Sequence, residues 1–152
     1  MLNSPVCLDA NLVVHLVTSG ERDAAIVHLW REWHEAGRPI VAPTLLQYEV
    51  SNALYRYVAH GVYSPEEAAK LLDMALGLRI ILFGHAALHR RALLLAGQFG
   101  LPAAYDAHYL AVAEMFGADF WTADQRLFEA VSAVWPRMHI VKGPSTAAGP
   151  ST

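Results

Sequence analysis

Short apolar runs alternate with longer amphipathic stretches along most of the chain. The apolar runs predict strands over residues 5–8, 39–42, 78–83, 119–122 and 138–141. Between these runs, apolar residues recur at the three- and four-residue spacing of a helix that packs on one face. The recurring pattern predicts helices over residues 11–18, 22–35, 44–58, 64–76, 86–99, 104–116 and 125–134.

Strands that alternate with helices favour an α/β fold. We expect a central, mainly parallel sheet of about five short strands with helices on both faces. Local signals support several helix ends. Ser64 with Pro65 and Glu67 is a helix start, and Thr44 with Gln47 has the spacing of a capping box. Gly61 and Gly117 are predicted helix stops.

The length of 152 residues suits one domain, which we place at residues 1–142. Residues 143–152 are small, polar and proline-bearing, so they predict a flexible tail.

No apolar run approaches the roughly 18–20 residues that span a membrane. Asp9 interrupts the first apolar run early, which argues against a signal peptide. The single cysteine, Cys7, fits a reducing compartment, so we expect a cytoplasmic protein in which Cys7 packs in the core rather than acting as a catalytic thiolate.

Composition and charge narrow the classes of function. The chain is 55% hydrophobic and 16% charged, which excludes disorder of the whole chain and predicts a surface for self-association or for a partner. The net charge of −3 argues against nucleic-acid binding by overall positive charge. Nucleic acid would therefore be bound only if the acidic residues cluster around cations.

Four acidic residues stand at the edges of apolar segments, where packing alone does not explain them. Asp9 directly follows the first strand, and Asp124 comes two residues after the fourth. Glu49 lies near the apolar face of its helix, and Asp106 lies in the first turn of its helix. Parallel sheets form sites beyond the carboxyl ends of their strands, at the point where the strand order reverses. We therefore expect these four side chains to converge.

Each acid taken alone has a simpler explanation. Glu49 would be a solvated residue at a helix edge, Asp106 would complement the positive end of its helix, and Asp124 would be an N-cap. Asp9 is harder to explain in this way, because a carboxylate that closes a buried strand usually has a partner.

Convergence of the four acids would require cations. Carboxylates about 5 Å apart repel by roughly 3 kcal/mol per pair at an effective dielectric constant near 20. Ligand sets made only of oxygen suit Mg²⁺ or Mn²⁺, which bind phosphate oxygens and activate water. Asn11 and Thr122 would then hydrogen-bond to the ligands and orient them.

The motifs around these acids resemble those of PIN-domain ribonucleases, specifically VapC-like toxins. The resemblance lies in Cys7–Asn11, Tyr48–Leu54, Tyr105–Ala113 and Asp119–Leu127, and it extends over about residues 4–142. It implies a three-layer PIN-like fold. It also implies a Mg²⁺- or Mn²⁺-dependent endoribonuclease that leaves 5′-phosphate and 3′-hydroxyl ends.

The resemblance assigns Asp9, Glu49, Asp106 and Asp124 as metal-binding catalytic residues, supported by Asn11 and Thr122. It further implies a homodimer, and a toxin that stops growth by inhibiting translation. A small cognate antitoxin would wrap the toxin and block its site.

Two other classes of function stay open. A non-catalytic PIN-like module would bind RNA or protein without cleavage, but it would have no reason to keep four mutually repelling acids. A phosphoacceptor receiver domain would need an acid pair after the first strand and a late lysine, which are not in place. Zinc is disfavoured because His85 and His89 lack the glutamate of a zinc-protease helix and no cysteine pair exists.

Other residues are weaker candidates for function. Arg90, Arg91 and Arg126 are possible phosphate contacts, although a solvated arginine is the commoner case. His108 faces away from Asp106 on an ideal helix, which predicts a surface or interface position rather than a catalytic base. Several aromatic residues would be able to stack on bases but more often belong to the core or to a dimer surface; they are Trp30, Trp33, Tyr48, Tyr55, Tyr57 and Tyr63.

Overall fold

The computed structural model of the protein describes residues 4–20 and 24–141. In this part of the chain, five strands alternate with seven helices. The strands are β1 (Val6–Leu8), β2 (Ile40–Pro43), β3 (Ile81–Phe83), β4 (Asp119–Thr122) and β5 (Met138–Ile140). The helices are α1 (Ala10–Thr18), α2 (Ala25–Glu35), α3 (Leu45–Ala59), α4 (Pro65–Leu76), α5 (Ala87–Gln98), α6 (Tyr105–Phe116) and α7 (Gln125–Val131).

The five strands form one sheet in the order β3-β2-β1-β4-β5, and every neighbouring pair is parallel. The predicted α/β fold is therefore confirmed, with a sheet that is wholly rather than mainly parallel. The chain builds outward from β1 through β2 and β3, then returns to place β4 on the other side of β1. The order consequently reverses between β1 and β4, and their carboxyl ends flank the switch point.

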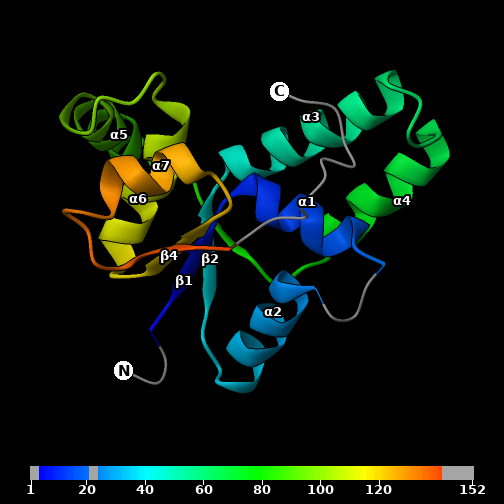
Figure 1. The fold of residues 1–152 in the computed structure, drawn as a ribbon, viewed down its shortest axis with the longest axis horizontal. Coiled ribbons are helices and arrows are strands. Elements are labelled where there is room, and N and C mark those ends of the chain that lie inside the picture. The colour runs from blue at the N-terminus through cyan, green and yellow to red at the C-terminus, as the bar shows by residue number, and fades with distance from the viewer. Residues whose placement is uncertain (1–3, 21–23, 142–152) are drawn as a thin grey trace.

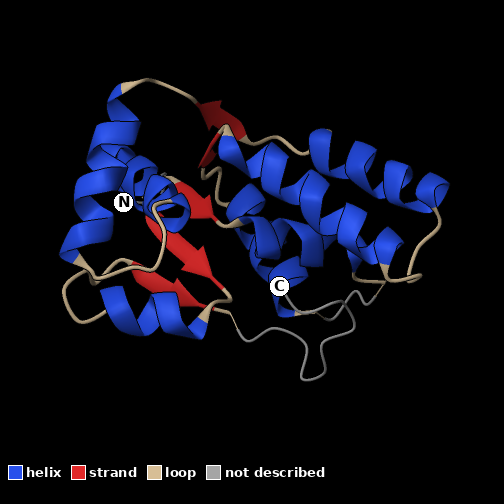
Figure 2. Ribbon diagram, turned by 90° about the horizontal axis from the view of Figure 1, so that it is seen from above, coloured by secondary structure: helices blue, strands red, loops and turns tan. Residues whose placement is uncertain are grey.

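Helices cover both faces of the sheet (Figures 1 and 2). Successive residues of a strand point to opposite faces. On one face Phe120 stacks against Tyr109 of α6, with ring centroids 6.1 Å apart. On the other face Trp121 meets Trp33 of α2 at 5.7 Å. Both faces of β4 are thus closed by aromatic contacts, and all of β1, including Cys7, is buried, as the sequence predicts.

Helices α3 and α4 pack together as a pair that extends to one side of the sheet (Figure 1). Glycine ends α3, because Gly61 adopts the left-handed φ of 74° that turns the chain back. The predicted start of α4 is confirmed: the Glu67 backbone N–H donates to Ser64 Oγ, and the Ser64 N–H donates to the Glu67 carboxylate. The end of α3 and the start of α4 are therefore both fixed by local signals in the turn between them.

The predicted capping box at Thr44 is wrong. Thr44 already has helical backbone angles, and its side chain caps no backbone N–H. The side chain instead packs beside the loop after β3, where a Cβ added at Gly84 would stand 2.9 Å from Thr44 Cγ2. Tertiary contact has thus taken the place of local capping.

Several predicted boundaries also differ from the structure. Strand β3 begins at Ile81 rather than residue 78, because Leu78 and Ile80 belong to the turn after α4, where their N–H groups donate to the Ala75 and Leu78 carbonyls. Helix α7 ends at Val131 rather than residue 134, and the next residues form a turn in which the Val134 and Trp135 N–H groups both donate to the Val131 carbonyl. The first residues of α1, α5 and α6 differ from the prediction by one residue. Helix α2 is described from Ala25, and the predicted start at residue 22 lies outside the described residues.

The predicted tail at residues 143–152 and the domain limit at residue 142 lie outside the described residues. None of the helices in the described ranges has the length and apolar character needed to cross a membrane.

Candidate active site

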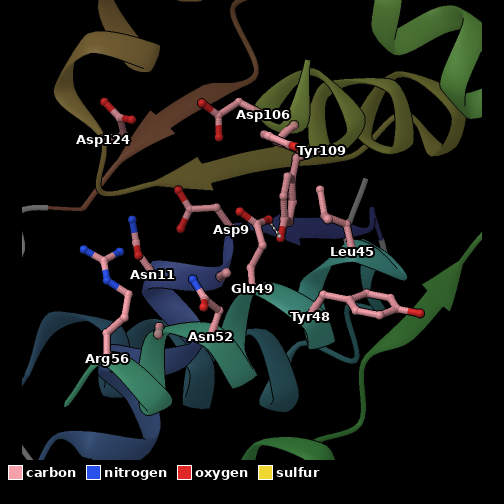
Figure 3. A pocket seen from close by; sticks show the side chains of 13 residues that line it. Asp9, Asn11, Leu45, Tyr48, Glu49, Asn52, Arg56, Asp106, Tyr109 and Asp124 are labelled. Carbon is pink, nitrogen blue, oxygen red and sulfur yellow. Dashed lines mark hydrogen bonds between the residues drawn. The ribbon is translucent and has the colours of Figure 1, made fainter. Parts of the chain in front are cut away.

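A cavity of about 350 Å³ opens at the carboxyl edge of the sheet, and all four predicted acids line it. Asp9 follows β1, Glu49 comes from α3, Asp106 from α6, and Asp124 follows β4 (Figure 3). Asn11 also lines the cavity. Side chains separated by up to 115 positions in sequence therefore face one space.

Asp9 is the most enclosed of the acids, with 7% of its surface exposed. Its backbone N–H donates to the Trp121 carbonyl at 3.3 Å, which ties it to β4. Its side chain caps α1, because Oδ1 accepts from the Leu12 N–H at 3.2 Å. Burial, together with the charges of Asp106 and Asp124, raises the pKa of Asp9 to about 6 despite these stabilising hydrogen bonds.

The Thr122 hydroxyl connects the ends of two strands. Thr122 is fully buried, and its Oγ1 donates to Oδ2 of Asp9. The same oxygen accepts from the Asp124 backbone N–H at 3.0 Å. Thr122 thus lies behind the cavity, where it orients one acid directly and holds the backbone of another.

Asp124 and Asp106 are both at helix starts. Asp124 caps α7, with Oδ1 accepting from the Arg126 and Leu127 N–H groups at 3.0 and 3.1 Å. This cap uses one carboxylate oxygen and leaves Oδ2 available to a ligand, so the simple capping role and a role in the cavity are compatible. Asp106 lies in the first turn of α6, and burial with the nearby charges of Asp124 and Glu49 raises its pKa.

Glu49 is positioned by Tyr109. The Tyr109 hydroxyl donates to Glu49 Oε1 at 2.7 Å, a bond that links α3 to α6 (Figure 3). Tyr109 is almost completely buried, and this burial and the adjacent Glu49 charge raise the pKa of the Tyr109 hydroxyl. The tyrosine therefore stays neutral and acts as a hydrogen-bond donor to the carboxylate.

The cavity has the donor chemistry of a magnesium or manganese site, because its charged ligands are carboxylate oxygens and two of the acids have raised pKa values. Among residues 4–20 and 24–141, no three acidic, histidine or cysteine side chains already stand close enough to coordinate one ion. Asp9, Glu49 and Asp124 are each held by hydrogen bonds to the protein. Coordination of one ion would require these carboxylates to turn toward one another.

The structure adds cavity residues that the sequence analysis did not single out for this site. Arg56 is the one basic residue among the described residues that line it. Asn52 and Tyr105 also line it. The helical period of α3 would have found two of them, because Asn52 and Arg56 lie three and seven residues after Glu49 on the same face.

The three arginines proposed as phosphate contacts are not among the residues that line the cavity. Arg91 donates two hydrogen bonds to Glu114, at 2.6 and 2.7 Å, so a phosphate would have to replace this partner. Arg90 and Arg126 are exposed. Arg126 lies beside one of the cavity acids, because its backbone N–H donates to Asp124 Oδ1.

Residues 6–134 match the family model of the PIN domain. This match spans most of the chain, and the protein therefore belongs to the PIN domain family, whose members are nucleases. A comparison with curated protein sequences gave no match.

Solved structures with the same fold include three with low sequence identity. PAE2754 from Pyrobaculum aerophilum is 23% identical, with a TM-score of 0.64 over 86% of each chain. A chain of a toxin-antitoxin complex from Klebsiella pneumoniae is 17% identical, with a TM-score of 0.59 over 88% of this chain and 94% of that one. A chain of VapBC2 from Rickettsia felis, bound to a DNA fragment from its promoter, is 14% identical, with a TM-score of 0.62 over 89% and 96%.

The raised pKa of Asp9 predicts a change in stability with pH. The carboxyl titrates at about 6 in the folded protein against 3.8 when unfolded, so the folded state holds the proton more tightly. Wild-type stability should therefore fall as pH rises from about 4 to 6, by up to about 3 kcal/mol. Asp9→Asn keeps a capping oxygen for α1, and in metal-free buffer at pH 7.5 it should unfold at higher urea concentration than wild type.

The control for this measurement is Asp73→Asn. It removes an exposed acid of α4 that does not line the cavity, and it should leave the pH dependence of stability unchanged. An Asp9→Asn protein that is less stable than wild type at pH 7.5 would show that the carboxylate stabilises the fold.

Removal of the Thr122 hydroxyl should destabilise the protein. Thr122→Val leaves Asp9 Oδ2 and the Asp124 N–H without their buried partner, at an expected loss of about 1–3 kcal/mol in urea unfolding. Thr122→Ser keeps the hydroxyl and should recover most of this loss. Equal stability of the valine variant and wild type would contradict the bridging role.

Proposed function

We propose that the protein is a Mg²⁺- or Mn²⁺-dependent endoribonuclease and the toxin of a toxin–antitoxin pair. The observation that carries this proposal is the convergence of Asp9, Glu49, Asp106 and Asp124 on one cavity at the switch point of the sheet. Membership of a nuclease family supports phosphodiester hydrolysis.

Some residues of the cavity would bind the metal, and others would orient these ligands. The four carboxylates would hold the metal, with Thr122 orienting Asp9 and Tyr109 orienting Glu49. One or two bound ions would activate a water molecule and stabilise the in-line displacement at phosphorus, which gives 5′-phosphate and 3′-hydroxyl ends. Arg56 lies on the cavity wall, where its guanidinium would contact a phosphate of the RNA.

Bound metal ions would also answer the objection from net charge. An acidic protein binds RNA poorly by overall electrostatics, but cations held by the acids would supply positive charge at the place of cleavage. The resulting attraction would be local and would depend on the metal.

An antitoxin partner is supported by the similarity in fold to chains of two toxin–antitoxin complexes. The surface offers contact areas for partners, since several large apolar side chains are exposed. Leu93 and Leu94 of α5 are 67% and 52% exposed, and Met115 of α6 is 48% exposed. We propose that a second copy of the chain and the antitoxin cover such surfaces, and that the toxin acts in the cytoplasm, where it would inhibit translation and arrest growth.

Cleavage should depend on both the metal and the acids. Purified protein free of antitoxin should cut structured RNA with Mn²⁺ or Mg²⁺, and EDTA should stop it. Asp106→Asn should lower kcat/KM by more than about 100-fold, which exceeds the effect usual for residues that only support a ligand. The matched control is again Asp73→Asn, which should cut like wild type. Cleavage that persists in EDTA, or none under any condition, would exclude the proposed function.

Metal binding should be visible without cleavage. In the absence of RNA, Mn²⁺ at a hundred times its Kd should stabilise the wild-type protein by about 2.7 kcal/mol. Asp9→Asn and Asp106→Asn should each weaken this response, as read by thermal unfolding. An equal response in the two variants and wild type would place the metal elsewhere.

A further inference from the structure

A second hollow, which we call the side pocket, lies next to the carboxylate cavity. It has a volume of about 300 Å³ and lies among the start of α3, the loop after β3, and helices α5 and α6. Leu45, Tyr48 and Tyr105 line both spaces, so the side pocket and the cavity are contiguous. Figure 3 shows that the Tyr48 ring extends away from the four acids.

The wall of the side pocket contains aromatic rings and differs from the wall of the cavity in charge. No acid, lysine or arginine is among the described residues that line it. Phe83 and His85 stack at 6.3 Å with their planes 27° apart. The residues Tyr48 and Tyr105 are 75% and 64% exposed, so they are accessible to a ligand. Such surfaces suit a planar, neutral group.

Histidines give this wall a defined polar edge. His108 Nδ1 is 2.7 Å from the Ala104 carbonyl and must donate to it. In the neutral ring His108 Nε2 then accepts from Nδ1 of His89, 3.0 Å away, which leaves Nε2 of His89 as an acceptor. His85 Nδ1 accepts from the Ala87 N–H at 3.1 Å, so its Nε2 is a donor. The pocket residues thus provide both a donor and an acceptor.

We propose that the side pocket binds one unpaired nucleobase of the RNA substrate, next to the phosphate that is cleaved at the four acids. The proposal rests on the proposed function. A nucleobase is flat and neutral, with hydrogen-bonding edges, and proteins read unpaired bases by stacking them on aromatic side chains. The phosphate chain would stay at the metal in the cavity while the attached base turns across Leu45, Tyr48 and Tyr105.

Two features favour a nucleobase over an apolar side chain of another protein. The side pocket and the cavity share Leu45, Tyr48 and Tyr105 as lining residues, so a nucleotide bound at the acids would have its base close to the side pocket. The donor of His85 and the acceptor of His89 would also match the hydrogen-bonding edge of a base, which a purely apolar side chain lacks. His108, which the sequence places away from Asp106, gains a role here as a wall of the pocket.

The test compares RNAs that differ only at one nucleotide beside the cleaved bond, with each of the four bases or with no base. Each flanking position is varied in turn. Wild-type protein with Mn²⁺ should show a kcat/KM about tenfold lower on the abasic RNA than on the preferred RNA, the order expected for one stacked base. Tyr48→Ala and His85→Ala should reduce this ratio to about two- to threefold. The ratio cancels any effect of these substitutions on the cleavage step.

The matched control is Tyr55→Ala, because Tyr55 is on the same helix as Tyr48 and 67% exposed but lines neither space. It should keep the wild-type ratio. Cleavage that ignores base identity, or a ratio that both pocket variants retain, would overturn the base pocket while leaving the nuclease intact. A changed oligomeric state of Tyr48→Ala in sedimentation, with no change in the ratio, would also overturn it and assign the pocket to a second copy.

A failure of cleavage itself would be distinguished by a binding measurement with Mg²⁺ present, because the attraction to RNA depends on the metal and RNA that is not cut still reports binding. RNA carrying 2-aminopurine at the flanking position should lose fluorescence on wild-type protein and keep it on Tyr48→Ala if the base stacks in the pocket. Equal fluorescence with both proteins would overturn the base pocket independently of catalysis.

Discussion

Leu8 pairs with Trp121 in parallel register, so β1 and β4 end side by side and the residues after them emerge at one edge of the sheet. The Asp9 N–H continues this pairing by donating to Trp121, and the Thr122 hydroxyl then joins Asp9 to the backbone of Asp124. The other two acids are brought to this edge by helices α3 and α6, which the Tyr109–Glu49 bond connects. The geometry of the site therefore depends on backbone pairing in the core rather than on mobile surface loops.

Helix ends partly compensate the negative charge of the acids in the cavity. Asp9 and Asp124 cap α1 and α7, and Asp106 lies in the first turn of α6, so three acids face positive helix ends. Each helix end contributes up to about 1 kcal/mol, whereas each pair of close carboxylates repels by roughly 3 kcal/mol. The helix ends therefore offset only part of the repulsion. Burial, together with the charges of the neighbouring acids, raises the pKa values of Asp9 and Asp106 despite these helix ends.

Much of the fold and the convergence of the acids could be predicted from sequence, because buried parallel strands are short and apolar and their ends carry the acids. Local signals were reliable where the segment is exposed, as at Ser64, and failed where tertiary packing intervened, as at Thr44. Arg56 could not be assigned to the site from its sequence context alone, because no motif surrounds it. Its place in the cavity follows only from the helix face that it shares with Glu49. The side pocket could not be predicted, because it is formed by four segments whose contact depends on the packing of α5 against α6.

Tyr48 and Glu49 are consecutive residues of α3. Glu49 lines the cavity and Tyr48 also lines the side pocket, since neighbouring positions on a helix point about 100° apart. A shift of this helix would move both side chains together. In the proposed ribonuclease, base recognition by Tyr48 and metal binding by Glu49 would therefore be linked through one backbone segment.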